Sequence, residues 1–531
     1  MSHWPGIMRC IASLACLLCL VHSLSFATDS RNLSYASAPP DNPLKGFMPY
    51  AGNYTTFPYS LEWFYLPVNS VMTGSNQFNW TPLETRLNQI ASRSNHAVFR
   101  FYLDYPTEPT GIPQYLLNAG LVTRSYNDYD NNGVSVSPDY ENPLLRSALT
   151  NFIYRLGAQY DGDPRIGFIT VGLLGFWGEW HTYPYWEPPN NWFASVTVQN
   201  EVLNAYQSAF TKTRYLLRQP HGTNPSSRPM GYHDDSFAYS TIDPPEWHFL
   251  GALKLAGETN KWRTQPIGGE IRPEIQSCLW DANTSGCPIP AQNYNQCVDL
   301  THATWMLNHA AFEPGFTGAK KDRAIAGARR LGYEFYVTNL TFTPGANTTT
   351  LAVMLRNTGV APFYYDWPIE LAALLDNGQL VRTWTTPWTL RGLLPVATNT
   401  IWSLSITNSQ LPDGVFALAM RAVNVLTNGK ALRFANTTQD QHRNGCLTLG
   451  RFQLNPPRLT AELQSDGSVK LGVKGGPPLG TTVEMTHTFQ SWDLFQTNLP
   501  VTNWSQVLPA ASLTNSTFFR LNLPIWSPST F

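Results

Sequence analysis

The stretch IGFITVGLLGFWGEWH, residues 166–181, joins an apolar run to a polar and aromatic cluster. The first nine residues carry only one polar side chain, which predicts a strand buried on both faces. GFWGEWH then places Glu179 between Trp177 and Trp180, with His181 directly after them. Side chains just past the end of a parallel strand are where β/α barrels carry their chemistry, so Glu179 is the first candidate for a functional carboxylate.

Strands alternate with helices on both sides of this stretch. HAVFRFYL (96–103) predicts a strand, and residues 141–160 and 199–213 have the apolar spacing of helices, the first with Pro143 in its opening turn. RYLLRQ, MGYHDDSF, TQPIGGEI and TWMLNHA indicate further strands. This alternation predicts a parallel sheet, and the length from about 44 to 325 fits an α/β fold of the (β/α)8 TIM-barrel type. A doubly wound open sheet is the alternative, although no GxGxxG follows any strand.

The pattern changes after residue 330. Short alternating strands with Asn-Gly turns at 376–379 and 427–430 predict an antiparallel β-sandwich over 331–455. Alternation continues beyond NPPRL (455–459), which predicts a small β module over 456–531. We therefore expect a barrel over 28–330, with the Pro-rich segment 29–43 docking on it.

Residues 1–27 predict a secretory signal peptide, because Arg9 precedes an apolar core at 11–21 and small residues follow. Four of the seven cysteines lie outside it: Cys278, Cys287, Cys297 and Cys446. An even number predicts two disulfides in an oxidising compartment, with three pairings open. Glycosylation sequons begin at Asn32, Asn53, Asn79, Asn283, Asn339, Asn347, Asn436, Asn503 and Asn515. A secreted glycoprotein is the expectation.

The composition limits the partners. Charged residues make up 13% and the net charge is −1, which argues against a nucleic-acid-binding surface. No stretch after the signal is long and apolar enough to predict a membrane span. Aromatic residues also make up 13%, and their flat faces suit the stacking of sugar rings, although core packing explains most of them. The oligomeric state stays open.

Two carboxylates point to a specific chemistry. Glu179 follows the expected fourth strand, and Glu270 in PIGGEIRPE ends the expected seventh. Two carboxyl groups facing one cavity are what glycosidic bond hydrolysis needs, one as proton donor and one as nucleophile or base. The apolar neighbours of Glu179 predict a raised pKa and a proton donor, while Gly268 and Gly269 let backbone and sugar approach Glu270. The alternative is that either glutamate is a structural hydrogen-bond acceptor.

Other residues at expected strand ends could bind the substrate. Arg100 and Asp104 follow the expected second strand, and Trp305 could be a sugar platform at the eighth. The whole predicted binding set is Arg100, Asp104, Trp177, Trp180, His181, His233, Asp234, Asp235, Trp305 and Asn308. Each has packing or a solvated loop as its alternative. We expect no catalytic metal, because no spaced histidine pair is present.

DYDNNGVSVSPD (128–139) matches part of a calcium-binding loop through Asp128, Asp130 and Asn132. It ends in Asp139 rather than glutamate and has no helix before it. A structural Ca²⁺ is possible there, and an Asn-Gly turn is the simpler interpretation.

Several of these pieces together resemble a known family. NPLKGF (42–47), HAVFRFYL, FITVGLLGFWGEWH, PIGGE and LRNTGVAPFYYDWPIELAAL (355–374) resemble a family of paired uncharacterised domains that joins a barrel to a β-sandwich. Lys45 stands where that family usually has arginine. The barrel is in turn similar to the clan of retaining glycosidases, which implies an acid/base glutamate after strand four and a nucleophile after strand seven. Glu179 and Glu270 match those places, whereas Gly178 replaces the asparagine that usually precedes the acid/base.

The sequence therefore predicts a secreted glycoside hydrolase that acts on a carbohydrate with a Glu/Glu pair by a retaining mechanism. A non-catalytic carbohydrate-binding or cell-wall-associated protein on the same scaffold is the alternative. A purely structural surface protein is the third class.

Overall fold

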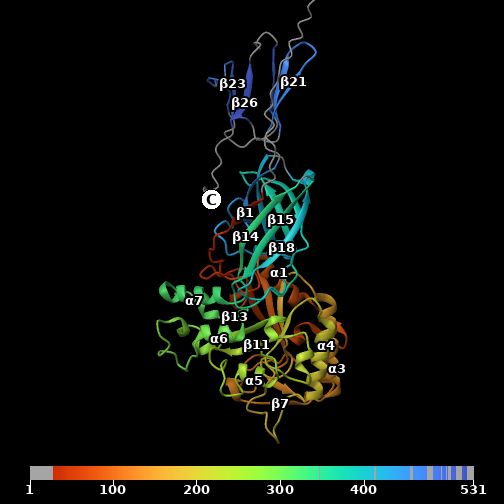
Figure 1. Ribbon diagram of the computed structural model, residues 1–531. Helices are drawn as coiled ribbons and strands as arrows, with labels where there is room; N and C mark the ends of the chain where they lie inside the picture. Colours follow the sequence, from red (N-terminus) through yellow and green to blue (C-terminus); the bar gives the residue numbers. More distant parts are fainter. Residues whose placement is uncertain are drawn as a thin grey trace, which may run out of the picture.

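The computed structural model describes residues 28–345, 347–411, 414–454, 458–474 and parts of 482–522. The predicted signal peptide over 1–27 lies outside these residues. A barrel, a β-sandwich and a small β module follow one another along the chain, and Figure 1 shows them stacked in that order. This confirms the predicted fold class.

Eight parallel strands form the barrel. Their order in the sheet is β2-β13-β12-β11-β10-β9-β6-β3. A bridge between Tyr50 and Trp63 closes the two ends of the sheet, with the Trp63 amide donating to Pro49 O at 2.9 Å. The strands are β2 (Gly46–Met48), β3 (Leu61–Pro67), β6 (His96–Tyr102), β9 (Ile166–Thr170), β10 (Tyr215–Leu217), β11 (Gly231–Phe237), β12 (Ile267–Ile271) and β13 (Trp305–Leu307).

Helices surround the barrel. The predicted helix at 141–160 is α3, which Asn142 caps by accepting from the Leu144 amide at 2.9 Å, with Pro143 in the first turn. Among the described residues, no helix is long and apolar enough to cross a lipid bilayer. The helices are α1 (Thr81–Ser92), α2 (Gln114–Asn118), α3 (Pro143–Tyr160), α4 (Val196–Ala209), α5 (Phe249–Leu255), α6 (Tyr294–Thr301) and α7 (Gly318–Arg330). Two small hairpins lie in the loops: β4 (Met72–Gly74) with β5 (Gln77–Phe78), and β7 (Thr123–Ser125) with β8 (Val136–Pro138).

Two antiparallel four-stranded sheets form the sandwich. One contains β1 (Asp29–Asn32), β14 (Phe335–Pro344), β15 (Thr348–Asn357) and β18 (Thr400–Thr407); the other contains β17 (Leu380–Thr385), β16 (Ile369–Leu374), β19 (Gly414–Ala422) and β20 (Leu447–Leu454). Strand β1 pairs with β14, from Asp29 opposite Phe342 to Asn32 opposite Asn339. The expectation that the leader segment docks on the barrel was therefore wrong for these residues, since they extend the sandwich.

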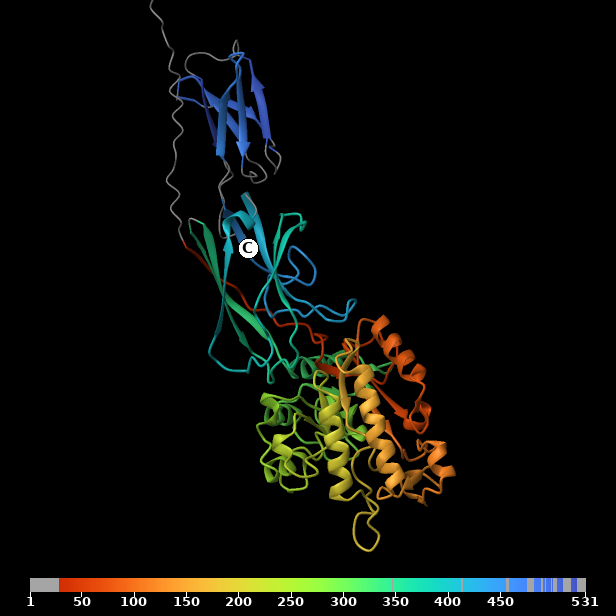
Figure 2. The same cartoon turned by 90° about the vertical axis from the view of Figure 1, so that its right-hand side faces the viewer.

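The sandwich packs on the N-terminal ends of the barrel strands. The Asn424 amide donates to His96, the first residue of β6, at 3.2 Å, and the Tyr365 hydroxyl bonds Gly167 O at the start of β9. One hydrophobic cluster runs from Trp63 and Phe168 inside the barrel to Trp367 and the sandwich core. In Figures 1 and 2 the loop with β7 lies at the opposite end of the barrel, away from the sandwich. The sandwich therefore covers the N-terminal ends of the barrel strands. It does not cover their C-terminal ends.

The terminal module consists of two three-stranded sheets. The strands are β21 (Arg458–Leu463), β22 (Val469–Lys474) and β25 (Trp504–Leu508) in one sheet, and β24 (Asp493–Gln496), β23 (Thr482–Thr486) and β26 (Phe518–Asn522) in the other. Leu471, Val473 and Val483 are fully or almost fully buried between them. Both views place the module at the far side of the sandwich from the barrel. It carries no residue of the predicted site.

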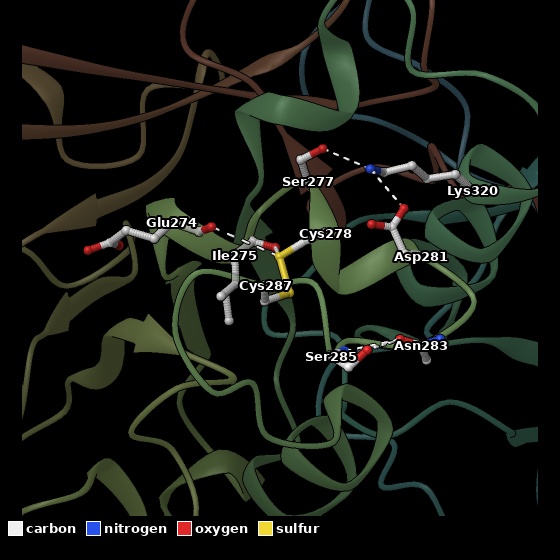
Figure 3. The surroundings of a disulfide bond; sticks show 9 residues. All are labelled: Glu274, Ile275, Ser277, Cys278, Asp281, Asn283, Ser285, Cys287 and Lys320. Atoms are coloured by element: carbon white, nitrogen blue, oxygen red, sulfur yellow. Dashed lines mark hydrogen bonds and ion pairs between the residues drawn. A yellow bond between two sulfur atoms is a disulfide. The ribbon is translucent and has the colours of Figure 1, made fainter.

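One disulfide is present among the described residues. Cys278 bonds Cys287, which closes a loop just after β12 (Figure 3). Lys320 anchors the same loop by donating to Ser277 at 2.9 Å and pairing with Asp281 at 3.0 Å. The prediction of a second disulfide was wrong, because Cys297 and Cys446 are free and buried, one in α6 and one in the sandwich core.

The sequon at Asn436 cannot carry a glycan in this fold. Its side chain is only 3% exposed, and its amide donates to Val337 O at 2.8 Å while its oxygen accepts from the Val337 amide at 3.1 Å. Asn436 instead ties the segment before β20 to β14. The other sequon asparagines among the described residues are exposed or half-buried.

Candidate active site

A tightly folded loop places Glu179 after the fourth barrel strand. Strand β9 ends at Thr170, earlier than the apolar run predicts, and the chain then enters left-handed conformations at Gly175 (φ 76°) and Gly178 (φ 68°). A Cβ on Gly175 would lie 2.4 Å from His181 O, so only glycine fits there. The Glu179 amide donates to Phe176 O at 2.8 Å, which closes the turn that presents its side chain.

The two tryptophans beside Glu179 have different places. Trp180 is 1% exposed and donates to Gly172 O at 3.1 Å, so it anchors the loop in the core and cannot stack on a sugar. Trp177 is half-buried and lies 4.8 Å from Tyr129, ring to ring. Of this predicted pair, only Trp177 is available to a ligand.

Glu179 is held as an ion. Arg100 Nη1 donates to Glu179 Oε1 at 2.9 Å, and His181 Nε2 lies 3.7 Å from Oε2. Burial acts to raise the pKa of Glu179, but the His181 contact and the charge of Arg100 outweigh it and lower the pKa below its usual range. The prediction of a raised pKa was wrong, because the spatial partners of the carboxylate outweigh its apolar neighbours in sequence.

Arg100 lies inside the third strand, β6, and not after the second as expected. Its Nε donates to Thr170 Oγ1 at 3.2 Å, and its guanidinium lies 5.3 Å from the centre of the Trp63 ring. The side chain is 1% exposed. A buried arginine of this kind fixes the position of the carboxylate that it binds.

Asp235 and Arg218 complete the polar cluster. Arg218, just after β10, pairs through Nε with Asp235 Oδ2 at 2.5 Å. Ligand atoms of Glu179, His181 and Asp235 lie within 4.8 Å of one another, which is close enough for a metal ion. This set does not fit a cation well, because Arg100 and Arg218 already neutralise two of its carboxylates. Burial and the nearby charge of Glu179 raise the pKa of Asp235 despite Arg218.

Glu270 sits on the seventh strand without a partner. It is 7% exposed and makes no hydrogen bond or ion pair with any residue that the structure describes. Burial, and then the charge of Glu179, raise the pKa of Glu270 well above its usual range. The pKa of Glu270, near the end of β12, is therefore raised, whereas that of Glu179, in the loop after β9, is lowered.

The glycines before Glu270 have a packing role. A Cβ on Gly268 would lie 2.3 Å from the Trp305 ring, and one on Gly269 would lie 2.5 Å from Asp234 O. The space above them is filled by neighbouring strands. The expectation that these glycines admit a sugar is corrected accordingly.

His233 and Trp305 fill the barrel interior below the carboxylates. Trp305 is 0% exposed and its ring lies 5.6 Å from that of His233 and 6.2 Å from that of Trp63. It cannot be the predicted sugar platform. His233 Nδ1 lies 3.5 Å from Arg100 Nη2, and burial lowers the pKa of His233 well below its usual range, so the ring is neutral and supports Arg100.

Three more predicted residues lie outside the cluster. Asp104 is buried and accepts from Tyr126 Oη at 2.5 Å and from Ser135 Oγ at 2.7 Å, so it holds the loop after β6. Asp234 is also buried; it accepts from Thr241 Oγ1 at 2.6 Å and serves the loop after β11. Asn308 is 0% exposed. None of the three is open to a substrate.

The loop at 128–139 does not fit a calcium ion. Asp128 Oδ2 accepts from Tyr185 Oη at 2.5 Å. The centre of the loop is filled by the Asn131 amide, which donates to Tyr126 O at 2.9 Å and accepts from the Ser135 amide at 2.9 Å. A side-chain amide thus takes the organising position that the metal has in calcium-binding loops.

The sequence did not single out Arg218 or three tyrosines near the carboxylates. Burial raises the pKa values of Tyr50, Tyr65 and Tyr105, and the nearby charges of Glu179 and Glu270 raise them further. Arg218 lies within RYLLRQ, the stretch predicted as a strand, so its position was available. Tyr65 lies in β3, a strand that the sequence did not reveal.

An aromatic ledge, defined as Trp177, Tyr129, Tyr183 and Trp186, extends outward from the carboxylates. Tyr129 Oη donates to Tyr183 O at 2.8 Å, and the Tyr183 and Trp186 rings lie 5.5 Å apart. Tyr183 is 53% and Trp186 52% exposed. Large exposed aromatic rings in a loop of the functional face suit a ligand with apolar faces and hydroxyl edges.

Two shallow hollows lie elsewhere on the described surface. One, of about 350 Å³, includes Arg228 and Lys261, and the other, of the same volume, includes Tyr54 and Lys430. Lys261 is paired with Glu258 at 2.8 Å, and neither hollow contains a pair of carboxylates. We therefore identify the candidate site by the two carboxyl groups at the strand ends and not by the volume of a hollow.

Comparisons with known proteins give matches in fold only. No protein-family model matches the chain, and neither does any curated protein. Among solved structures, a GH5_18 protein of Bifidobacterium longum matches 50% of this chain and 68% of its own at 12% identity, with a TM-score of 0.33. A GH5-4 broad specificity endoglucanase from an uncultured bacterium matches 56% and 96% at 11% identity (TM-score 0.32), and a GH26 beta-mannanase from Bacteroides ovatus matches 55% and 90% at 10% identity (TM-score 0.30). Similarity at this level assigns no activity.

Proposed function

We propose that this protein is a secreted glycoside hydrolase in which Glu179 and Glu270 cleave the glycosidic bond. The observation that carries the proposal is the contrast between the two carboxyl groups. Glu270 is buried and unpartnered, whereas Glu179 is ion-paired with Arg100 at 2.9 Å. Both stand at the C-terminal ends of strands of one barrel, the face on which such barrels carry their active sites.

The contrast matches the chemistry of glycosidic cleavage. One carboxyl group must be protonated to assist the leaving oxygen, and the other must be ionised to attack the anomeric carbon or to activate water. Neighbouring groups whose environments separate their pKa values are a general mark of an acid/base pair. The retaining mechanism is the proposed outcome, with the carboxylate acting as nucleophile.

The surroundings suit a carbohydrate. The aromatic ledge offers Trp186 and Tyr183 for stacking on sugar rings, and Arg218 and Asp235 can bond hydroxyl groups. Tyr50 and Tyr105 add phenol groups beside the carboxylates. Secretion is part of the proposal, supported by the signal-like leader and the Cys278–Cys287 disulfide.

The test is a panel of aryl glycosides and cell-wall polysaccharides with the wild type, Glu179→Gln and Glu270→Gln. Each substitution should lower turnover by about 10²–10⁴-fold, the usual contribution of an acid or base group. Glu462→Gln is the matched control, because Glu462 is an exposed glutamate of β21 in the terminal module, away from both carboxyl groups. It should retain full activity.

The non-catalytic alternative gives a different result. A carbohydrate-binding or cell-wall-associated protein would bind oligosaccharides without any turnover, and both glutamine variants would bind as the wild type does. That outcome would end the hydrolase proposal.

A further inference from the structure

The two carboxyl groups of the site have opposite electrostatic partners. Glu179 is contacted by Arg100 at 2.9 Å and lies 3.7 Å from His181. Glu270, on strand β12, is 7% exposed and has no hydrogen-bond or ion-pair partner among the described residues. The resemblance to retaining glycosidases implies a proton donor at Glu179 and an ionised nucleophile at Glu270, and these partners favour the reverse.

In the part of the chain that the structure describes, each cation that acts on Glu270 already has a carboxylate partner. The strongest charges acting on Glu270 are those of the Glu179 and Asp235 carboxylates and of the Arg100 and Arg272 guanidinium groups. Arg100 is committed to Glu179. Arg272 donates from Nε to Glu274 at 2.8 Å and from Nη1 to Ser236 at 3.2 Å.

The remaining neighbours of Glu270 do not replace a cation. Tyr50, Tyr65 and Tyr105 are phenols whose pKa values burial raises, so they are neutral. A buried carboxyl group keeps its proton when its neighbours are carboxylates and neutral phenols and the nearby guanidinium groups are paired with other carboxylates.

We propose that the catalytic roles are exchanged relative to that clan: Glu270 donates the proton and Glu179 is the nucleophile. This inference rests on the proposed function and deepens it. Arg100 is then a positioning residue that keeps Glu179 ionised, and His233 supports Arg100 from below through the 3.5 Å contact.

The exchanged roles give a balanced reaction. The Glu270 proton passes to the glycosidic oxygen while the bond from that oxygen to the anomeric carbon breaks, and a Glu179 oxygen bonds the anomeric carbon. Glu270, now a carboxylate, then takes a proton from water as the water oxygen attacks the anomeric carbon. This step releases Glu179 as a carboxylate and returns the proton to Glu270.

The position of the proton can be measured without a substrate. Protein carrying ¹³C only in its glutamate side-chain carboxyl groups allows infrared bands of glutamates to be separated from those of aspartates. The wild type at pH 7 should show a protonated-glutamate band that is absent in Glu270→Gln and unchanged in Glu462→Gln, which alters an exposed glutamate of the terminal module. A band that persists in Glu270→Gln would overturn the inference.

The roles themselves are separated by kinetics on a glycoside that the wild type cleaves. Glu270→Ala should keep kcat/KM, which reports the first step, within about tenfold on a dinitrophenyl glycoside, whose leaving group needs no protonation. On a substrate with a sugar leaving group its kcat/KM should fall by about 10²–10⁴-fold. Glu179→Ala should lose activity on both, and azide should rescue it as a glycosyl azide of inverted configuration. The opposite pattern would restore the roles that the resemblance implies.

If the proposed hydrolase function is wrong, the experiments give a different set of results. A wild type that cleaves no glycoside would remove the hydrolase proposal and the catalytic roles together, and the infrared band would still report where the proton resides.

Discussion

His96 makes the joint between barrel and sandwich sensitive to acid. Its ring is 2% exposed; Nδ1 bonds Pro164 O at 2.9 Å and Nε2 accepts from Asn424 at 3.2 Å. The Asn424 amide cannot turn round, because it also donates to Lys430 O at 2.9 Å and accepts from the Leu426 amide at 2.9 Å. If His96 were protonated, its Nε2 would become a hydrogen-bond donor facing the Asn424 amide, which is also a donor, in a buried position.

The magnitude follows from the pKa of His96. Burial lowers it from 6.5 to about 4, despite the bonds to Pro164 and Asn424. The unfolded chain takes up the proton below about pH 6.5 and the folded protein only near pH 4, so this stability is complete above pH 6.5 and is lost as the pH falls toward 4. The full loss is about 3 kcal/mol, at 1.36 kcal/mol for each pH unit, and about 2 kcal/mol of it falls between pH 7 and pH 5.

The assay compares the wild type with His96→Gln in urea titrations at pH 8, 7, 6 and 5. The difference between the two proteins at pH 8 reports the packing effect of the substitution alone. From pH 7 to pH 5 the wild type should lose about 2 kcal/mol more than the variant. Parallel losses would refute the reasoning and mean that His96 is protonated in the folded protein.

Three further predictions concern the barrel core, the cysteines and the aromatic ledge. Gly268→Ala brings a Cβ to 2.3 Å from the Trp305 ring and should lower the free energy of unfolding by about 1–3 kcal/mol in denaturant titrations, whereas Gly286→Ala, with no atom within 4 Å, should change it by less than about 0.5 kcal/mol. Thiol labelling of the purified protein in denaturant without reductant should mark Cys297 and Cys446 and neither Cys278 nor Cys287; complete protection of all four would restore the second disulfide. Trp186→Ala should weaken oligosaccharide binding about tenfold by calorimetry, because a ring that is 52% exposed loses its stacking partner, and unchanged affinity would remove the ledge from the site.

The order of strands and helices could be predicted because apolar residues are spaced differently in the two kinds of element. Glu179 follows the fourth strand and Glu270 lies near the end of the seventh, as expected. Strands β2 and β3 escaped notice, since GFM is too short to show a period and LEWFYLP carries a glutamate in an apolar run. Arg100 was placed after the second strand, whereas it lies in the third.

Partners distant in sequence could not be predicted. The residues next to Glu179 in the chain are aromatic, but Arg100 is its partner in space, 79 residues away in the sequence. The burial of Trp305 has a similar origin. A small barrel fills its interior with side chains from several strands, so a strand-end tryptophan can point into the core.

The cysteine pairing shows the same limit. The spacing of four cysteines allows three pairings, and it also allows free thiols when the chain places two of them in separate cores. Cys297 lies in α6 of the barrel and Cys446 in the sandwich core. Their separation is a property of the fold and not of the spacing.

The hydrophobic cluster that joins barrel and sandwich bears on how this protein can evolve. A domain that recombination moves from one enzyme to another needs an outer surface that is already polar. Here Trp63, Val98 and Phe168 of the barrel share one apolar interior with Leu355 and Trp367 of the sandwich. A gene break near residue 330 would leave both halves with an exposed apolar interior, so we expect barrel and sandwich to be inherited together. The terminal module has its own small core and is the part that we expect to be exchangeable.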